Sequence, residues 1–320
     1  MMTNSSQGVV CHMAPHGAHV TDGERHMKPW HGVLVANATL YDDALGIDLD
    51  ALGEHIAWLA ASGCHGVIPN GSLGEYQVLD DEERAAVVRT AVAAAPDGFS
   101  VIPGVAAYGA RESRAWAEQA AEAGADGVLA LPPNAYRADQ RAVLAHYAEI
   151  ARAGLPVVAY NNPIDTKVDL VPELLAALHA QGSIVAVKEF SGDVRRGWQL
   201  AELAPDLDLV VGADDVLLEL MLAGAKGWIA GYPNALPTTC VELYEACRDH
   251  DLERALPLYR LLHPLLRWDS KTEFVQAIKL SMDMAGRRGG PCRPPRQALT
   301  EQQTETVRSA TEQALRAGCC

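Results

Sequence analysis

The sequence lacks several features that would place it in common classes of protein. No stretch of its 320 residues combines the length and apolarity that a membrane span needs. Positive charge is scarce, because 26 Lys and Arg stand against 41 Asp and Glu and leave a net charge of −15. A chain with this excess of acid repels nucleic-acid backbones and anionic lipids. We therefore expect neither a nucleic acid nor a membrane as a partner.

Cysteine and aromatic residues are sparse as well. The seven cysteines are scattered, none forms a Cys-x-x-Cys pair, and no secretory signal precedes them. This usage is typical of reduced thiols and predicts a cytoplasmic protein. The adjacent Cys319 and Cys320 are expected to be exposed and prone to oxidation. Aromatic residues make up only 6%, so Ala, Leu and Val must fill most of the core.

The first residues lack apolar periodicity. Residues 1–26 contain four histidines together with Gly, Ser and Thr. Irregular spacing of the histidines favours a solvated tail over a metal site. We predict a disordered N-terminal extension over residues 1–29, with the folded protein starting near Met27–Trp30.

From Val33 onward, short apolar runs alternate with helical patterns. Leu49–Ala61 has apolar residues at helical spacing, and Asp80–Ala95 opens with acidic residues that suit the positive end of a helix. Eight strand-then-helix units of this kind predict an α/β fold, a closed (β/α)8 TIM barrel over residues 30–249. A C-terminal three-helix extension, or helical cap, is expected over residues 250–320, with helical segments near Leu252–Leu266, Lys271–Met284 and Thr300–Ala317.

In a parallel barrel, the residues that end the strands converge on the face where the chemistry of such folds is located. Lys188 follows the buried, β-branched run Ser183–Val187. Burial of a lysine there is costly and lowers its pKa, and a neutral amine can attack a carbonyl carbon. A surface lysine that merely ends a strand is the alternative, and that stretch alone favours it.

Two other strand ends carry chemistry. The glycines of the turn Gly71–Glu75 free backbone N–H groups to face an anion, either a carboxylate or a phosphate. The turn lacks the Lys-Ser/Thr of a P-loop, and it is also compatible with a plain connection. Tyr160 could relay protons or could simply be packed and hydrogen-bonded. An imine between Lys188 and a 2-oxo acid would act as an electron sink, so a bond at C3 can break or form without a cofactor.

Three motifs together resemble the dihydrodipicolinate synthase/N-acetylneuraminate lyase family of class I aldolases. These are Gly-Ser-Leu-Gly-Glu after the second strand, Tyr-Asn-Asn-Pro after the fifth and Val-Lys-Glu at the sixth, and the resemblance covers roughly Trp30 to Ala317. It implies a (β/α)8 barrel with a helical cap, a homotetramer built as a dimer of dimers, and catalysis with no cofactor or metal.

The resemblance also implies site residues. It makes Lys188 the Schiff-base lysine, Tyr160 the proton-relay tyrosine and Ser72 the first hydroxyl residue of the loop that binds the carboxylate of the 2-oxo acid. Further contacts with the substrate are expected from residues at or after strand ends, namely Gly71, Leu73, Asn134, Tyr136, Asp165, Ile229 and Gly231.

Departures from the family pattern bear on the reaction. Leu73 replaces the second threonine of the carboxylate loop, and Tyr136 stands in, with a register shift, for a tyrosine that reaches a neighbouring subunit's site. Asp165 occupies the place of the arginine with which the synthases bind a second substrate's carboxylate, and it would repel that group. The motif Tyr-Asn-Asn-Pro together with Lys-Glu-Phe-Ser-Gly-Asp-Val-Arg-Arg is more similar to the catabolic members of the family, which include a 1-pyrroline-4-hydroxy-2-carboxylate deaminase and 2-keto-3-deoxy sugar acid dehydratases.

We therefore predict a lyase that eliminates water or ammonia from one small 2-oxo or cyclic imino acid. An aldolase or synthase that condenses pyruvate with an aldehyde, or cleaves such a product, is the alternative within the family. A metal-dependent aldolase would need clustered ligands, and His65 has no partner at a suitable spacing. A non-catalytic relative that only binds a 2-oxo acid is the remaining alternative.

Overall fold

The computed structural model describes residues 27–320. Its centre is a sheet of eight short parallel strands, and their order along the chain alternates with helices as the sequence predicts. The strands are β1 Gly32–Val35, β2 Gly66–Val67, β3 Ser100–Val101, β4 Val128–Ala130, β5 Val157–Asn161, β6 Ala186–Glu189, β7 Asp208–Val211 and β8 Gly227–Ala230.

The sheet closes on itself. Strands β1 and β8, the first and the last, are neighbours, and the open ends of the strand order are β3 and β4. Between those two, Gly104 forms a parallel bridge with Leu129, and the Val105 N–H donates to the Leu129 carbonyl at 3.0 Å. The predicted (β/α)8 barrel is therefore confirmed, because a closed barrel leaves no sheet edge unpaired.

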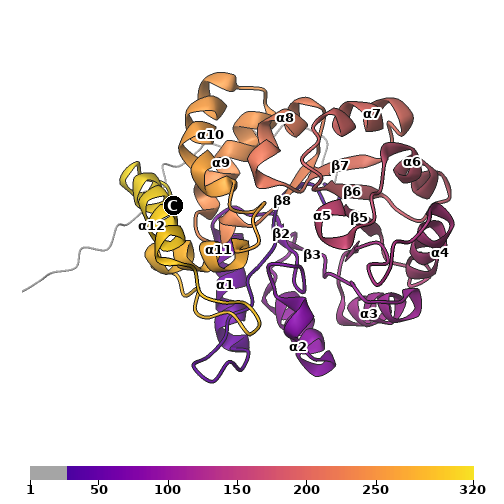
Figure 1. Cartoon of the computed structure of the whole chain (residues 1–320), viewed down its shortest axis with the longest axis horizontal. Coiled ribbons are helices and arrows are strands. Elements are labelled where there is room, and N and C mark those ends of the chain that lie inside the picture. The colour runs from indigo at the N-terminus through magenta and orange to yellow at the C-terminus, as the bar shows by residue number, and fades with distance from the viewer. Residues whose placement is uncertain (1–26) are drawn as a thin grey trace, which may run out of the picture.

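Helices surround the barrel (Figure 1). Because the outer helices cover the strands, residues of β1 are buried on both faces, which explains their apolar character. The α-helices are α1 Leu49–Ala61, α2 Asp81–Ala94, α3 Ala110–Ala123, α4 Gln140–Ala151, α5 Pro163–Thr166, α6 Pro172–Ala180, α7 Arg195–Leu203, α8 Leu217–Leu222, α9 Pro237–Arg248, α10 Leu252–Leu266, α11 Phe274–Met284 and α12 Glu301–Arg316. Short 3-10 helices are η1 Tyr76–Val78, η2 Asp214–Val216 and η3 Tyr232–Asn234.

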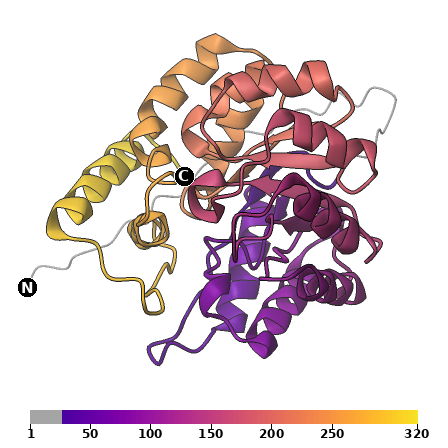
Figure 2. The ribbon, with the colours of Figure 1, turned by 45° about the vertical axis from the view of Figure 1, so that its right-hand side comes forward.

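Helix boundaries follow local chemistry. Asp80 and Glu83 form a reciprocal capping box that starts α2, so the acidic residues satisfy N–H groups that the first turn leaves free. Helix α1 has the bounds that its apolar periodicity predicts. The cap helices α10, α11 and α12 lie together at one side of the barrel (Figures 1 and 2), which confirms the C-terminal extension.

Three sequence expectations need comment. Strand β6 begins three residues later than expected, so Lys188 lies inside the strand and not after it. Residues 183–185 connect helix α6 to strand β6. The Val185 N–H, just before the strand, donates to the Val157 carbonyl of β5 at 3.0 Å. The expected exposure of the terminal cysteines is wrong for Cys319, which is only 7% exposed, and Cys320 is partly buried. Most of the predicted N-terminal extension, residues 1–26, lies outside the described residues.

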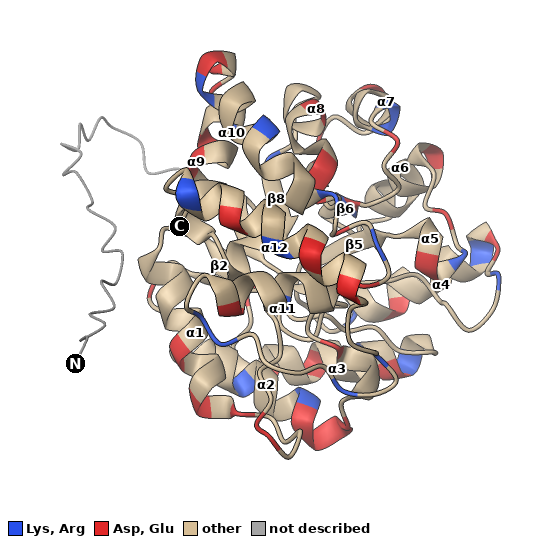
Figure 3. Ribbon diagram, turned by 60° about the vertical axis from the view of Figure 1, so that its left-hand side comes forward, with Lys and Arg blue, Asp and Glu red and all other residues tan. Residues whose placement is uncertain are grey.

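Acidic and basic residues are interspersed over the outer helices (Figure 3). Within residues 27–320, no helix has both the length and the apolarity that crossing a membrane would require.

Candidate active site

A pocket of about 370 Å³ opens where the strands end. Residues from the ends of β1, β2, β4, β5, β6 and β8 line it, together with residues 269–272, Phe274 and Arg296 of the cap. Its volume suits a small metabolite. Among the residues expected to form the site, those that line this pocket are Gly71, Ser72, Leu73, Asn134, Tyr160, Asp165, Lys188, Ile229 and Gly231.

Tyr136 is placed differently. Its side chain is 60% exposed, and it does not line the pocket. The neighbouring Asn134 does, and its Oδ1 is buried without a hydrogen-bond partner among the described residues. An unpaired acceptor in a pocket wall is costly, so this oxygen is available to a ligand's donor.

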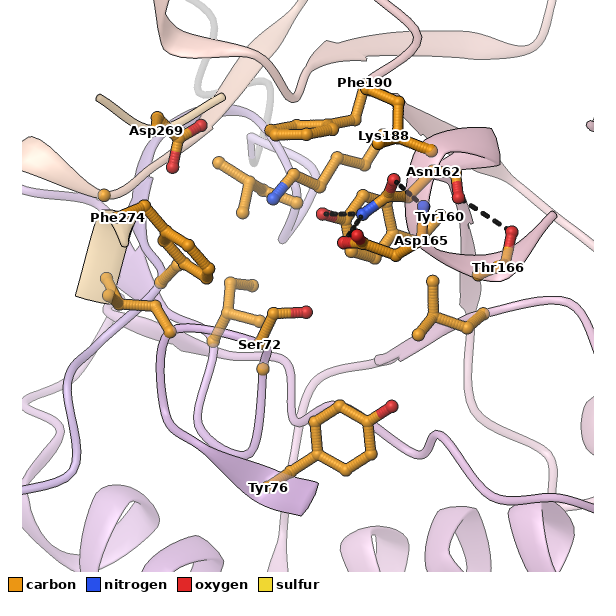
Figure 4. Close-up of a pocket in the computed structure, with 18 of the residues that line it drawn as sticks. Ser72, Tyr76, Tyr160, Asn162, Asp165, Thr166, Lys188, Phe190, Asp269 and Phe274 are labelled. Atoms are coloured by element: carbon orange, nitrogen blue, oxygen red, sulfur yellow. Dashed lines mark hydrogen bonds between the residues drawn. The ribbon is translucent and has the colours of Figure 1, made fainter. Parts of the chain in front are cut away.

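Lys188 carries its amine into the pocket from β6 (Figure 4). The ammonium nitrogen lies 4.4 Å from the centre of the Tyr160 ring and 5.6 Å from that of Phe190. A Cβ at Gly212, which follows β7, would lie only 2.5 Å from the Glu189 carbonyl oxygen and 2.9 Å from Lys188 Cγ, so the close approach of β6 requires a glycine there. Burial lowers the pKa of Lys188, while the charges of Asp269 and Asp214 act in the opposite direction.

Tyr160 is tied to Asp165 through one amide. Asn162 Nδ2 donates to the Tyr160 hydroxyl at 3.3 Å and to Asp165 Oδ2 at 2.8 Å (Figure 4). Asn162 Oδ1 in turn accepts from the Asp165 N–H at 3.2 Å, which fixes the turn after β5. Burial raises the pKa of Tyr160, and the negative charges of Asp269 and Asp165 raise it further. The phenol is therefore held in its protonated form.

The turn after β2 presents free donors. Among the hydrogen bonds of residues 27–320, none uses the N–H of Ser72 or Leu73 or the Ser72 hydroxyl. Both residues line the pocket, and the Ser72 side chain points into it from the side opposite Phe190 (Figure 4). Adjacent free N–H groups form an anion site, which can hold a carboxylate.

A buried ion pair holds this turn in place. Glu75, which ends the turn, accepts from Lys279 Nζ of α11 at 2.9 Å and from the Arg293 N–H at 3.1 Å. The side chains of Glu75 and Lys279 are both almost completely buried. Glu75 adopts a left-handed conformation, with φ of 54°, and Thr39 Oγ1 donates to the Gly74 carbonyl at 2.7 Å. The cap and the start of the barrel thus fix the turn together.

Asp269 is the functional candidate that the sequence did not reveal. It lies between α10 and α11, and its carboxylate points into the pocket from the side opposite Tyr160 (Figure 4). Burial raises its pKa to about 6, while the positive charge of Lys188 and the Asp214 N–H lower it. No strand ends at Asp269, and strand ends were the only signal that the sequence offered.

Two cations of the cap also line the pocket. Lys271 Nζ lies 3.9 Å from the centre of the Trp268 ring, and Arg296 lies 5.3 Å from that of Phe274. Both are absent from the residues expected from the sequence, since they follow helices of the cap.

His65 has a structural environment. Its Nδ1 accepts the Val33 N–H at 3.1 Å, and burial lowers its pKa. Within residues 27–320, no group of three His, Cys, Asp or Glu side chains is arranged as metal ligands would be.

Comparison with known proteins agrees with this geometry. Residues 29–314 match the model of the dihydrodipicolinate synthetase family. The chain is 34% identical to the 4-hydroxy-tetrahydrodipicolinate synthase of Methanospirillum hungatei, over 87% of this chain and 97% of that protein. It is 32% identical to a DapA-like lyase of Halobacterium salinarum, over 85% and 90%.

Solved structures are similar as well. The dihydrodipicolinate synthase of Aquifex aeolicus superposes with a TM-score of 0.84 and 26% identity, over 91% of this chain and 99% of that one. An Escherichia coli K12 prophage protein of the same family, solved in complex with pyruvate, gives a TM-score of 0.83 at 26% identity, over 91% and 99%. The chain belongs to the dihydrodipicolinate synthetase family.

Proposed function

We propose that the protein is a Schiff-base-forming lyase that eliminates water or ammonia from a small 2-oxo acid or cyclic imino acid. The observation that carries this proposal is the buried Lys188 amine, which shares one pocket with a protonated phenol and two unused N–H groups. Pyruvate in the related Escherichia coli prophage protein supports a 2-oxo acid as the ligand.

The reaction begins at C2 of the substrate. The substrate's carboxylate rests on the Ser72 and Leu73 N–H groups, and the neutral amine of Lys188 attacks the carbonyl carbon. Tyr160 donates its proton to the carbonyl oxygen, which leaves as water when the imine forms. Asn162 orients the phenol for this step through its hydrogen bond. The protonated imine then draws electrons from C3, so a proton there becomes acidic.

Asp165 favours elimination over condensation. It lines the pocket beside Tyr160, where a second substrate with its own carboxylate would have to lie. Two like charges about 4 Å apart at an effective dielectric near 20 cost on the order of 4 kcal/mol. Elimination of a C4 hydroxyl or amine requires no second carboxylate site and avoids this cost.

Condensation or cleavage by a pyruvate-dependent aldolase is the second candidate. It is favoured by the names of several relatives, which are 4-hydroxy-tetrahydrodipicolinate synthases. Lys271 and Arg296 also supply cations in the pocket wall, so a carboxylate could lie near the cap instead of near Asp165. We propose further that the enzyme is a cytoplasmic homotetramer, in which the exposed Tyr136 contacts a second subunit.

A trapping experiment and a substrate panel test the proposal. Borohydride reduction with pyruvate is expected to add covalent mass at Lys188, and Lys188→Ala abolishes the addition. The panel compares 1-pyrroline-4-hydroxy-2-carboxylate, 2-keto-3-deoxy sugar acids, and pyruvate with aspartate semialdehyde. We expect one of the eliminations to be fastest. Faster condensation would establish the second candidate, and an unmodified Lys188 would leave only a binding protein.

A further inference from the structure

We propose that Asp269 is the catalytic base that removes the C3 proton from the Lys188-bound substrate and delivers it to the leaving group at C4. This inference rests on the proposed function, because it needs the imine at Lys188. It assigns a chemical role to the cap, whose other residues in the pocket serve as lining.

The position of Asp269 suits this role. A Cβ on Gly231, which follows β8, would lie 3.2 Å from Asp269 Oδ1, so the carboxylate lies directly over the end of that strand. Tyr160 approaches from β5, and the Lys188 amine lies between the two groups (Figure 4). A substrate held on Lys188 would have the phenol on one side and the Asp269 carboxylate on the other.

Other groups are less suited to remove the proton. Tyr160 donates its proton at C2 when the imine forms and regains it when water hydrolyses the imine, so its raised pKa suits the steps at C2 and leaves C3 to another base. The Asp214 carboxylate is engaged by the Trp228 Nε1–H at 2.9 Å and by the Gly231 N–H at 3.2 Å, and it does not line the pocket. Asp165 accepts from Asn162 and lies on the Tyr160 side. The Asp269 carboxylate accepts the Asp214 N–H but no side-chain donor within residues 27–320, which leaves its other lone pairs available.

The electrostatic surroundings keep both forms of Asp269 accessible. The titratable groups that interact electrostatically with Asp269 are Lys188, Asp214, Asp215, Tyr160 and Tyr232. Burial brings the pKa of Asp269 to about 6, near the value at which one group can both accept and release a proton at neutral pH.

The proton balance closes within one turnover. The carboxylate takes the C3 proton, and the C–H electron pair forms the enamine with the Lys188 nitrogen as its sink. The enamine then forms a C3–C4 double bond as the C4–O or C4–N bond breaks. Asp269 gives its proton to the departing hydroxide or amine, which leaves as water or ammonia. Asp269 returns to its carboxylate form without any further acid or base.

Pyruvate separates this step from imine formation, because its methyl group provides the C3 protons. The test incubates the full-length protein with pyruvate in D2O and follows the exchange of the methyl protons by NMR. Parallel samples are reduced with borohydride to measure the imine at Lys188. The variants are Asp269→Asn and Asp269→Glu. Asp215→Asn is the matched control, since Asp215 accepts from Ser270 at the same junction without lining the pocket.

We expect Asp269→Asn to lower the exchange rate by roughly 10²–10⁴-fold, as loss of a general base does. Imine trapping persists, because removal of the Asp269 charge lowers the pKa of Lys188 further and favours the neutral amine. Wild-type exchange slows as the pH falls through about 6, where Asp269 becomes protonated, and this limb is absent in Asp269→Asn. Asp269→Glu restores part of the exchange. Asp215→Asn keeps fast exchange at neutral pH and keeps the pH limb, shifted to lower pH because a charge that raises the pKa of Asp269 is lost.

Distinct outcomes overturn the two proposals. If wild-type Lys188 is not trapped, the proposed function fails. If it is trapped and Asp269→Asn still exchanges at the wild-type rate, Asp269 is not the base. Loss of trapping together with exchange in Asp269→Asn would mean that Asp269 acts on Lys188 itself, and a wild type that is trapped without exchanging C3 protons also refutes the inference.

Discussion

Two buried lysines of this protein differ in what surrounds their charge. Lys279 is 1% exposed and forms an ion pair with Glu75 at 2.9 Å. Lys188 is 6% exposed, and no carboxylate within residues 27–320 forms an ion pair with it. A buried ion pair holds its two side chains together, whereas a buried lysine without a carboxylate partner is more easily deprotonated. The first is therefore suited to hold structure and the second to act as a nucleophile.

The role of Tyr160 can be tested by removing a single oxygen. Tyr160→Phe is expected to lower turnover by roughly 10²–10⁴-fold, because the imine then forms without its acid. The variant loses only the hydrogen bond from Asn162, so the free energy of unfolding falls by about 1 kcal/mol. The measurements are steady-state turnover and thermal unfolding. A large loss of stability with unchanged turnover per folded molecule would show that the phenol serves packing.

Among single residues, the sequence predicts those site residues that lie at the ends of strands. Lys188, Tyr160 and Ser72 follow from the rule that parallel strands present their C-terminal ends on one face. Asp269, Lys271 and Arg296 do not follow from it, because their positions depend on how the cap docks onto the barrel. No local pattern encodes that contact.

Among the elements, the turn after β2 depends on helix α11. Lys279→Met leaves the Glu75 carboxylate buried without its partner, and we expect a loss of about 3–5 kcal/mol in the free energy of unfolding. Arg316→Met is the control, because it breaks an exposed pair with Glu312 on α12 and should cost about 1 kcal/mol or less. Urea denaturation measures both. Equal losses would mean that the buried pair adds nothing to holding the turn.

Element type was predictable, and element boundaries less so. Helical periodicity gave α1, and acidic residues marked the start of α2. The sequence predicts too early a start for strand β6, because residues 183–185 are in part apolar and β-branched, as strand residues are. In the structure these residues form the connection from α6. Periodicity cannot distinguish a buried strand from the buried segment that leads into it.

For the whole molecule, truncation tests where the folded part of the chain begins. Deletion of residues 1–26 is expected to leave the melting temperature and the oligomeric state unchanged, since that stretch lacks apolar periodicity. Residues beyond it are engaged, because Lys28 Nζ and Trp30 Nε1 each donate to Asp208 at 2.8 Å. Calorimetry and light scattering provide the measurement, and deletion of residues 1–30 is the comparison that should destabilise the fold.

The closure of the barrel also has a consequence for synthesis on the ribosome. Strand β1 pairs with β8, and Glu75 pairs with a lysine 204 positions later in the chain. A nascent polypeptide that has emerged only as far as β6 contains Lys188 but neither of these partners. Contacts so distant in sequence form late. The turn after β2, although among the first parts to be translated, is therefore completed only after α11 has emerged, and a prematurely terminated chain would expose an unfinished pocket.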